Sequence, residues 1–203
     1  WEAWHNAMSE AHRALWRQAG IPDEFQDYWQ LGFTTYETRD FTSPALTIPF
    51  FDSGWEAKTI QYRLTNPPQP NDKYRFQEGL KAQMWKAEQD TDIKGAVLMC
   101  EGMKKAAVSF IELVAKASNN LTVTAVPSKM PGQDILRGLA NADPLFICLD
   151  PDVTSKEVHR IIKMLPNVPK RLVKLPTKAD DFFTLYHGTS SDFMGFINQA
   201  TRI

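Results

Sequence analysis

The chain has 203 residues, of which 43% are hydrophobic and 23% charged. These are ordinary values for a folded protein, and the length fits one domain or two small ones. The formal net charge of −1 excludes a strongly basic surface, so any nucleic-acid contact must be local. No apolar run approaches the ~20 residues of a membrane span. The two cysteines are too few for a zinc ribbon. Because the chain opens at Trp1 without an initiator methionine, we expect it to be part of a longer protein.

The first part of the chain, residues 1–90, predicts a small lobe of helices and strands. Apolar residues at three- and four-residue steps predict one helix over 1–20, ended by Gly20 and Pro22. A second short helix is expected over 23–30. Residues 45–64 predict a β-hairpin with its turn at 52–54, in which Arg63 lies on the polar face of the second strand.

Basic and aromatic side chains are interleaved just after the proline-rich loop 66–71. They are Lys73, Tyr74, Arg75 and Phe76. Such a stretch, together with Arg63, can hold a phosphate backbone and stack a base. An ordinary surface strand is the alternative, and the sequence leaves both open.

The second part, residues 91–203, alternates strands with helices. Strands are expected at 95–100, 121–126, 144–149 and 171–175, and helices at 103–117, 132–141, 154–165 and 190–201. This alternation predicts an α/β fold with a mostly parallel sheet and helices on both faces.

Acidic residues follow three of these strands. Glu101 ends the first, Asp150 and Asp152 follow the third, and Asp180 and Asp181 follow the fourth. Open α/β sheets bind ligands at the carboxyl ends of their strands, and residues two apart in an extended chain point the same way. Carboxylate oxygens suit Mg²⁺ or Mn²⁺. We therefore expect Glu101, Asp150 and Asp152 to hold one ion, with Asp180 and Asp181 able to serve a second.

Structural alternatives exist for the same residues. Asp150 and Asp152 could cap the helix that begins near Thr154. Lys104 and Lys105 lie within a turn of Glu101, where they could contact nucleotide phosphate or be solvated helix positions.

These residues carry a family resemblance. Residues 99–106, Met-Cys-Glu-Gly-Met-Lys-Lys-Ala, resemble the first Toprim motif, and 147–152, Ile-Cys-Leu-Asp-Pro-Asp, resemble the Asp-x-Asp motif. The tail at 178–183, with Gly188, is similar to the acidic segment of primase Toprim domains of phage and plasmid origin. Upstream, 20–25 and 31–33 resemble the entry of bacterial DnaG-type primase cores, 48–52 and 62–63 their hairpin, and 73–76 their basic segment.

The resemblance implies the catalytic core of a DNA primase, an enzyme that makes RNA primers on single-stranded DNA by metal-dependent nucleotidyl transfer. Glu101 would be a metal ligand or general acid/base, Asp150 and Asp152 would hold Mg²⁺ or Mn²⁺, and Asp180 or Asp181 would be a further ligand. Arg63, Lys73 and Arg75 would contact the phosphates of the template or of the nucleotide.

The implied partners are a single-stranded DNA template, nucleoside triphosphates and a replicative helicase, which could be part of the same polypeptide. No membrane partner is implied. The implied location is the cytoplasm of a bacterial host, with the gene carried by the host, a phage or a plasmid.

The sequence departs from the bacterial pattern at several points. Pro151 replaces a glycine, Val153-Thr154-Ser155 follow in place of the usual continuation, and the tail holds only one aspartate pair. Two alternatives stay open: a Toprim nuclease that uses the same acids to cut, and a non-catalytic Toprim module that binds DNA or a partner.

Overall fold

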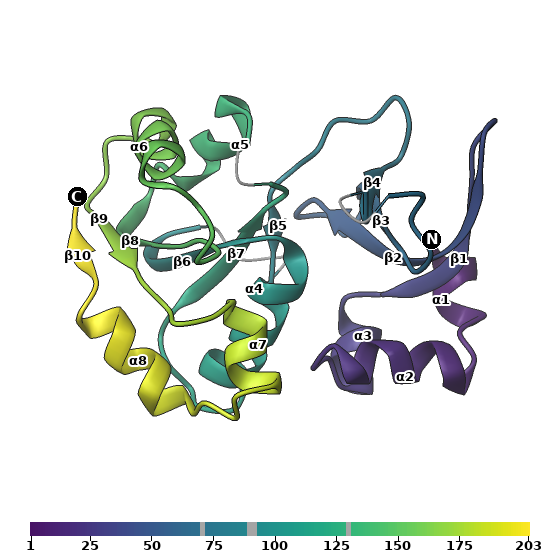
Figure 1. Cartoon of the computed structure of the whole chain (residues 1–203), viewed down its shortest axis with the longest axis horizontal. Coiled ribbons are helices and arrows are strands. Elements are labelled where there is room, and N and C mark those ends of the chain that lie inside the picture. The colour runs from purple at the N-terminus through teal and green to yellow at the C-terminus, as the bar shows by residue number, and fades with distance from the viewer. Residues whose placement is uncertain (70–71, 89–92, 129–130) are drawn as a thin grey trace. The chain divides into compact units, whose positions relative to one another are not determined.

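The structure is a computed structural model that describes residues 1–69, 72–88, 93–128 and 131–203 (Figure 1). The chain divides into two compact units, Trp1–Ala82 and Gln83–Ile203. The boundary expected between residues 90 and 91, and the end of the proline-rich loop at 70–71, lie outside the described residues. Within the described ranges, no helix combines the length and the apolar character needed to cross a bilayer.

The first unit is an antiparallel sheet preceded by three short helices. The helices are α1 (Glu2–Asn6), α2 (Glu10–Gln18) and α3 (Asp23–Tyr28), and the sheet runs β1-β2-β3-β4, formed by Gly32–Glu37, Thr42–Phe51, Ala57–Leu64 and Tyr74–Phe76. The predicted hairpin is present as β2 and β3, with Ile48 opposite Gln61. Strand β1 was not predicted.

The single helix expected over residues 1–20 is wrong, because the chain breaks between α1 and α2. Ser9 begins the second helix: its hydroxyl accepts a hydrogen bond from the His12 amide, and the Ser9 amide donates to His12 Nδ1. Such a cap satisfies amide groups that the start of a helix leaves without partners. The apolar spacing continues across the break, so periodicity alone could not reveal it.

The polar side of β3 is also not the solvated surface that its alternation predicts. Thr59 and Gln61 are buried, opposite Phe50 and Ile48 of β2. Both faces of this part of the sheet are therefore covered, although one carries polar side chains.

The second unit is a six-stranded sheet in the order β10-β9-β8-β6-β7-β5. Its strands are β5 (Trp85–Lys86), β6 (Gly95–Glu101), β7 (Thr122–Val126), β8 (Ala142–Cys148), β9 (Lys170–Val173) and β10 (Thr201–Arg202). Strands β6 to β9 run parallel, and β5 and β10 pair antiparallel at the two edges. All four predicted strands are present, and the two edge strands were not predicted.

Helices cover both faces of this sheet, as the sequence predicted (Figure 1). They are α4 (Met103–Phe110), α5 (Gln133–Leu136), α6 (Ser155–Met164), α7 (Ala179–Thr184) and α8 (Ser190–Asn198). Val97, Met99, Leu145 and Ile147 on one face pack with the α5 and α6 segments in a single apolar cluster. On the other face Cys100 lies beside Ser109 of α4.

The expected helices differ from the observed ones in detail. The helix over 103–117 ends as α4 at Phe110 and continues as a π-helical turn, Ile111–Ala115. The helix over 132–141 is the short α5 followed by a 3₁₀ turn, Arg137–Leu139. Helix α7, which carries both tail aspartates, was not predicted as a helix.

Candidate active site

The strand order of the second unit reverses direction between β6 and β8. These strands are parallel neighbours with Cys100 opposite Cys148. From β6 the chain passes through α4 to β7, on one side of β6, whereas from β8 it passes through α6 to β9, on the other side. Such a reversal of strand order is where open α/β sheets bind ligands. Glu101 ends β6 and Asp150 follows β8, so both lie at this point.

Gly102 controls how the chain leaves β6. Its φ of +82° is a left-handed conformation that side chains with a Cβ rarely adopt, and its amide donates to the Val126 carbonyl at 2.8 Å. Helix α4 begins at the next residue, Met103. This tight turn places Lys104 and Lys105 in the first helical turn, directly beyond Glu101.

Lys105 lies between the two strand ends. Its Nζ is 2.9 Å from Asp150 Oδ1 and donates a hydrogen bond of 2.9 Å to the Glu101 carbonyl oxygen. Burial acts to lower the pKa of Lys105, but the hydrogen bond with Asp150 and the charges of Asp150, Glu101 and Asp180 outweigh burial and raise it. The ammonium is therefore held in its charged form by three carboxylates from three different segments.

Asp180 is the most buried acid of this group, with 2% of its surface exposed. Its Oδ2 lies 2.5 Å from Lys104 Nζ, while its Oδ1 is buried without a hydrogen-bond partner in the described structure. Asp181 is the next residue of α7, so its side chain leaves the helix roughly 100° away from that of Asp180. The two tail aspartates therefore do not point to one place.

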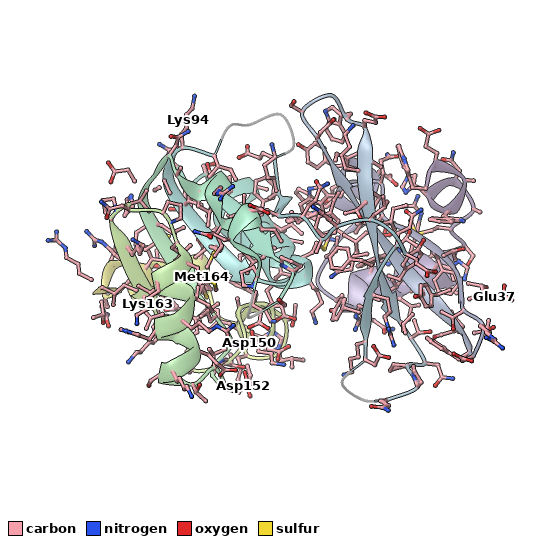
Figure 2. All side chains as sticks on the ribbon, turned by 90° about the horizontal axis from the view of Figure 1, so that it is seen from above. Glu37, Lys94, Asp150, Asp152, Lys163 and Met164 are labelled. Atoms are coloured by element: carbon pink, nitrogen blue, oxygen red, sulfur yellow. The ribbon has the colours of Figure 1, made fainter. Side chains whose placement is uncertain are left out.

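Asp150 and Asp152 both lie on the loop after β8, but their surroundings differ (Figure 2). The Asp150 side chain is 11% exposed and is paired with lysine, whereas Asp152 is exposed and forms no ion pair within the described ranges. Neither caps α6. That role belongs to Thr154, which accepts from the Glu157 amide while its own amide donates to the Glu157 carboxylate. The capping alternative is therefore wrong.

Two predicted lysines and one further lysine lie beside the acids. Lys104 and Lys105 are partly buried, and each is ion-paired with an acid of the cluster, so the alternative of fully solvated helix positions is wrong, whereas contact with nucleotide phosphate stays a prediction. Lys178, which was not proposed as a site residue, has its Nζ 3.7 Å from Asp150 Oδ2. Nothing in the local pattern connects Lys178 with Asp150, since the two meet only through the fold.

The donor set is compatible with a divalent cation. In the parts of the chain that the structure describes, no three His, Cys, Asp or Glu side chains are gathered at metal-ligand spacing. Glu101, Asp150 and Asp180 nevertheless act on one lysine cation, and Asp180 keeps an unsatisfied buried oxygen. Hard oxygen donors of this kind are those that Mg²⁺ and Mn²⁺ prefer.

A cavity of about 480 Å³ opens beside Asp150. Its walls include apolar residues of the loop after β8, of α6, and of β9 and the segment after it, among them Leu149, Val158 and Leu175, and Lys174 and His159 also line it. This volume lies within the usual range of small-molecule sites.

The basic residues predicted in the first unit do not share one face. Arg63 is opposite Tyr74 in the β3–β4 register, whereas Arg75 is opposite Tyr62 and therefore on the other face. Arg75 is also ion-paired with Asp72. Lys73 precedes β4 and is exposed.

Sequence comparisons and structural comparisons give different results. No protein-family model and no curated protein matches the chain. Among solved structures, the chain has the fold of DnaG-type primase catalytic cores, and the similarity covers nearly its whole length. This result confirms the predicted resemblance and fold class.

Three solved structures illustrate this similarity. The first is the Aquifex aeolicus primase with its zinc-binding and RNA polymerase domains, at a TM-score of 0.73 and 15% identity, covering 96% of this chain and 57% of that one. The DnaG primase catalytic domain bound to single-stranded DNA gives 0.70 and 14%, covering 95% and 72%. The primase fragment of the bacteriophage T7 primase-helicase gives 0.66 and 13%, covering 89% and 72%.

Proposed function

We propose that the chain is the catalytic core of a DNA primase, which joins ribonucleotides on a single-stranded DNA template by metal-dependent nucleotidyl transfer. The observation that carries this proposal is the placement of Glu101 and Asp150 at the ends of adjacent parallel strands, at the reversal point of a sheet shared with primase cores. The buried Asp180 joins them from α7.

Glu101, Asp150 and Asp180 are the residues that would hold Mg²⁺ or Mn²⁺. A bound ion would supply positive charge to the phosphate oxygens of a nucleotide. Asp152 lies on the same loop as Asp150 and would reach the metal ion after a change in the conformation of that loop. Asp181 would lie near the ion without binding it directly. Lys178 is 51% exposed beside Asp150, so its ammonium can turn toward an incoming phosphate.

The partners that we propose are a single-stranded DNA template, nucleoside triphosphates and a replicative helicase. Support comes from the similar DnaG domain bound to single-stranded DNA and from the fragment of the T7 primase-helicase. We propose Arg63, Lys73, Tyr74 and Arg75 as template or phosphate contacts. Because Arg75 lies on the opposite face from Arg63 and Tyr74, we expect it to contribute less than they do.

The test is a priming assay with a single-stranded template, labelled ribonucleotides and Mn²⁺. We expect labelled oligoribonucleotides, and we expect Glu101→Gln to lower their rate of synthesis by about 10²-fold or more. Glu112→Gln is the matched control, because Glu112 is paired with the exposed Lys116 further along the same helical segment.

The same assay separates the alternatives. Nicking of plasmid DNA without synthesis would favour the Toprim nuclease. Binding of single-stranded DNA without either activity would favour the non-catalytic module. Synthesis that survives unchanged in Glu101→Gln would refute the proposed role of the acids.

A further inference from the structure

Among the described residues, three lysines lie beside the three acids of the candidate site. Glu101, Asp150 and Asp180 provide three negative charges, and Lys104, Lys105 and Lys178 provide three positive ones. All six come from three short stretches of chain: the β6–α4 turn, the loop after β8 and the start of α7. Within the part of the chain that the structure describes, the cluster therefore combines acids and lysines from distant segments.

The three lysines are not equivalent. Lys178 is 51% exposed and approaches only Asp150, at 3.7 Å. Lys104 pairs with the far side of the cluster, at Asp180 Oδ2. Lys105 is the least exposed of the three, at 17%, and its Nζ lies 2.9 Å from Asp150 Oδ1 and donates a hydrogen bond of 2.9 Å to the Glu101 carbonyl oxygen. Lys105 thus holds the central position.

We propose that Lys105 is an internal counter-ion that occupies the cation position of this site, so that a divalent ion binds only by displacing its ammonium. This inference rests on the proposed function, because it takes Glu101, Asp150 and Asp180 as the ligands. An ammonium and a divalent ion repel each other at short distances, and a divalent ion bound by Asp150 would compete with Lys105 for the Asp150 carboxylate. Lys105 therefore lowers the affinity for metal and stabilises the metal-free fold.

The chain offers a matched pair of variants for the test. Lys105→Met keeps most of the apolar stem and removes the charge. Lys116→Met removes a lysine of the same charge and length that is 59% exposed and paired only with Glu112. Asp150→Asn removes a proposed ligand.

The main measurement is calorimetric titration of the full chain with Mn²⁺ at one fixed pH. We expect Lys105→Met to bind Mn²⁺ at least tenfold more tightly than the parent chain, Lys116→Met to bind like the parent, and Asp150→Asn to lose binding. Thermal unfolding in EDTA should show Lys105→Met melting below the parent, with added Mn²⁺ raising its Tm by more than it raises that of the parent.

A second measurement uses the parent chain and does not depend on a variant that folds. Amine acetylation followed by peptide mass spectrometry should label Lys105 slowly without metal, and Mn²⁺ should increase this labelling at least threefold because the ammonium is released. Labelling of Lys116 should not change.

The outcomes separate this inference from the proposed function. Mn²⁺ binding that requires Asp150, but that neither tightens in Lys105→Met nor increases labelling of Lys105, would overturn the counter-ion role and leave the metal site standing. If neither the parent nor folded Lys105→Met bound Mn²⁺, both the metal-dependent function and the inference would fail.

Discussion

The ion pair between Lys104 and Asp180 gives the sharpest prediction about stability. The Asp180 side chain is 3% exposed, whereas Lys104 is 25% exposed, and the two atoms lie 2.5 Å apart. In Lys104→Met the Asp180 carboxylate stays buried, and its pairing group is gone. Removal of one partner of a buried pair costs about 3–5 kcal/mol. Because Lys105 and its charge remain nearby, we expect the low end, about 3 kcal/mol.

The two partners should respond unequally. In Asp180→Asn the charge left over is Lys104, whose ammonium can turn to water, so we expect a loss of only about 1 kcal/mol. The double variant should cost about 1–2 kcal/mol, less than the sum of the single changes, which gives a coupling of about 2–3 kcal/mol. For a unit of this size, the loss in Lys104→Met corresponds to a Tm lower by about 10 °C.

The assay is urea unfolding in EDTA, followed by circular dichroism, for the parent, the two single variants and the double variant. Lys116→Met serves again as control, because its exposed pair with Glu112 should contribute less than about 1 kcal/mol. A loss below about 1 kcal/mol in Lys104→Met, or strict additivity in the double variant, would show that Asp180 is not a buried charge that depends on Lys104.

Three further predictions concern separate parts of the chain. Thr154→Ala should lower the free energy of unfolding by about 1 kcal/mol because it removes the cap of α6. Asp152→Ala should change the free energy of unfolding by less than about 0.5 kcal/mol. Chemical denaturation measures both, and equal losses would refute the assignment of the cap to Thr154. The hydrogen bond with Cys100 and burial raise the pKa of Cys148, and both cysteines are buried. Both thiols should therefore resist Ellman's reagent until the protein unfolds, and prompt labelling of the native chain would contradict their burial. Gly32→Ala should lower the free energy of unfolding by about 1–3 kcal/mol, since the new Cβ would lie 3.0 Å from the backbone of α1. An unchanged Tm would show that α1 can shift to make room for the methyl group at no cost in stability.

Local pattern was enough to predict the strands that are buried on both faces. The runs at 95–100 and 144–149 are uninterrupted and apolar because β6 and β8 have helices on both sides. Strand β1 was missed because its side chains beyond Gly32 are only partly buried or exposed, so its apolar signal is weak. The edge strands β5 and β10 contain two residues each, which is too short for any periodicity.

The candidate site was predictable only in its acids. Glu101 and Asp150 stand out in the sequence because each comes at the end of an apolar run. The fold places these two residues at the ends of neighbouring parallel strands. Their partners depend on contacts between distant segments. Lys104 of α4 meets Asp180 through the packing of α7 against α4, and Lys178, just before α7, meets Asp150 of the β8 loop; no spacing along the chain encodes either contact. The different surroundings of Asp150 and Asp152 have a local cause, because the loop after β8 turns at residues 151–152 and is not extended there.

The charges at the strand ends bear on how the site would change when it binds a metal ion. Among the described residues, Lys104 and Lys105 lie in the turn after Glu101, and Lys178 lies just before Asp180, so acids and lysines come together when the sheet and α7 assemble. Buried acids without such partners would repel one another and favour protonation. Under the proposed function, an incoming cation would take the acids, and the freed lysines would meet the phosphates of a nucleotide. Lys105 and the more exposed Lys178 would then change partners in turn, and the side chains that stabilise the metal-free fold would also hold a substrate.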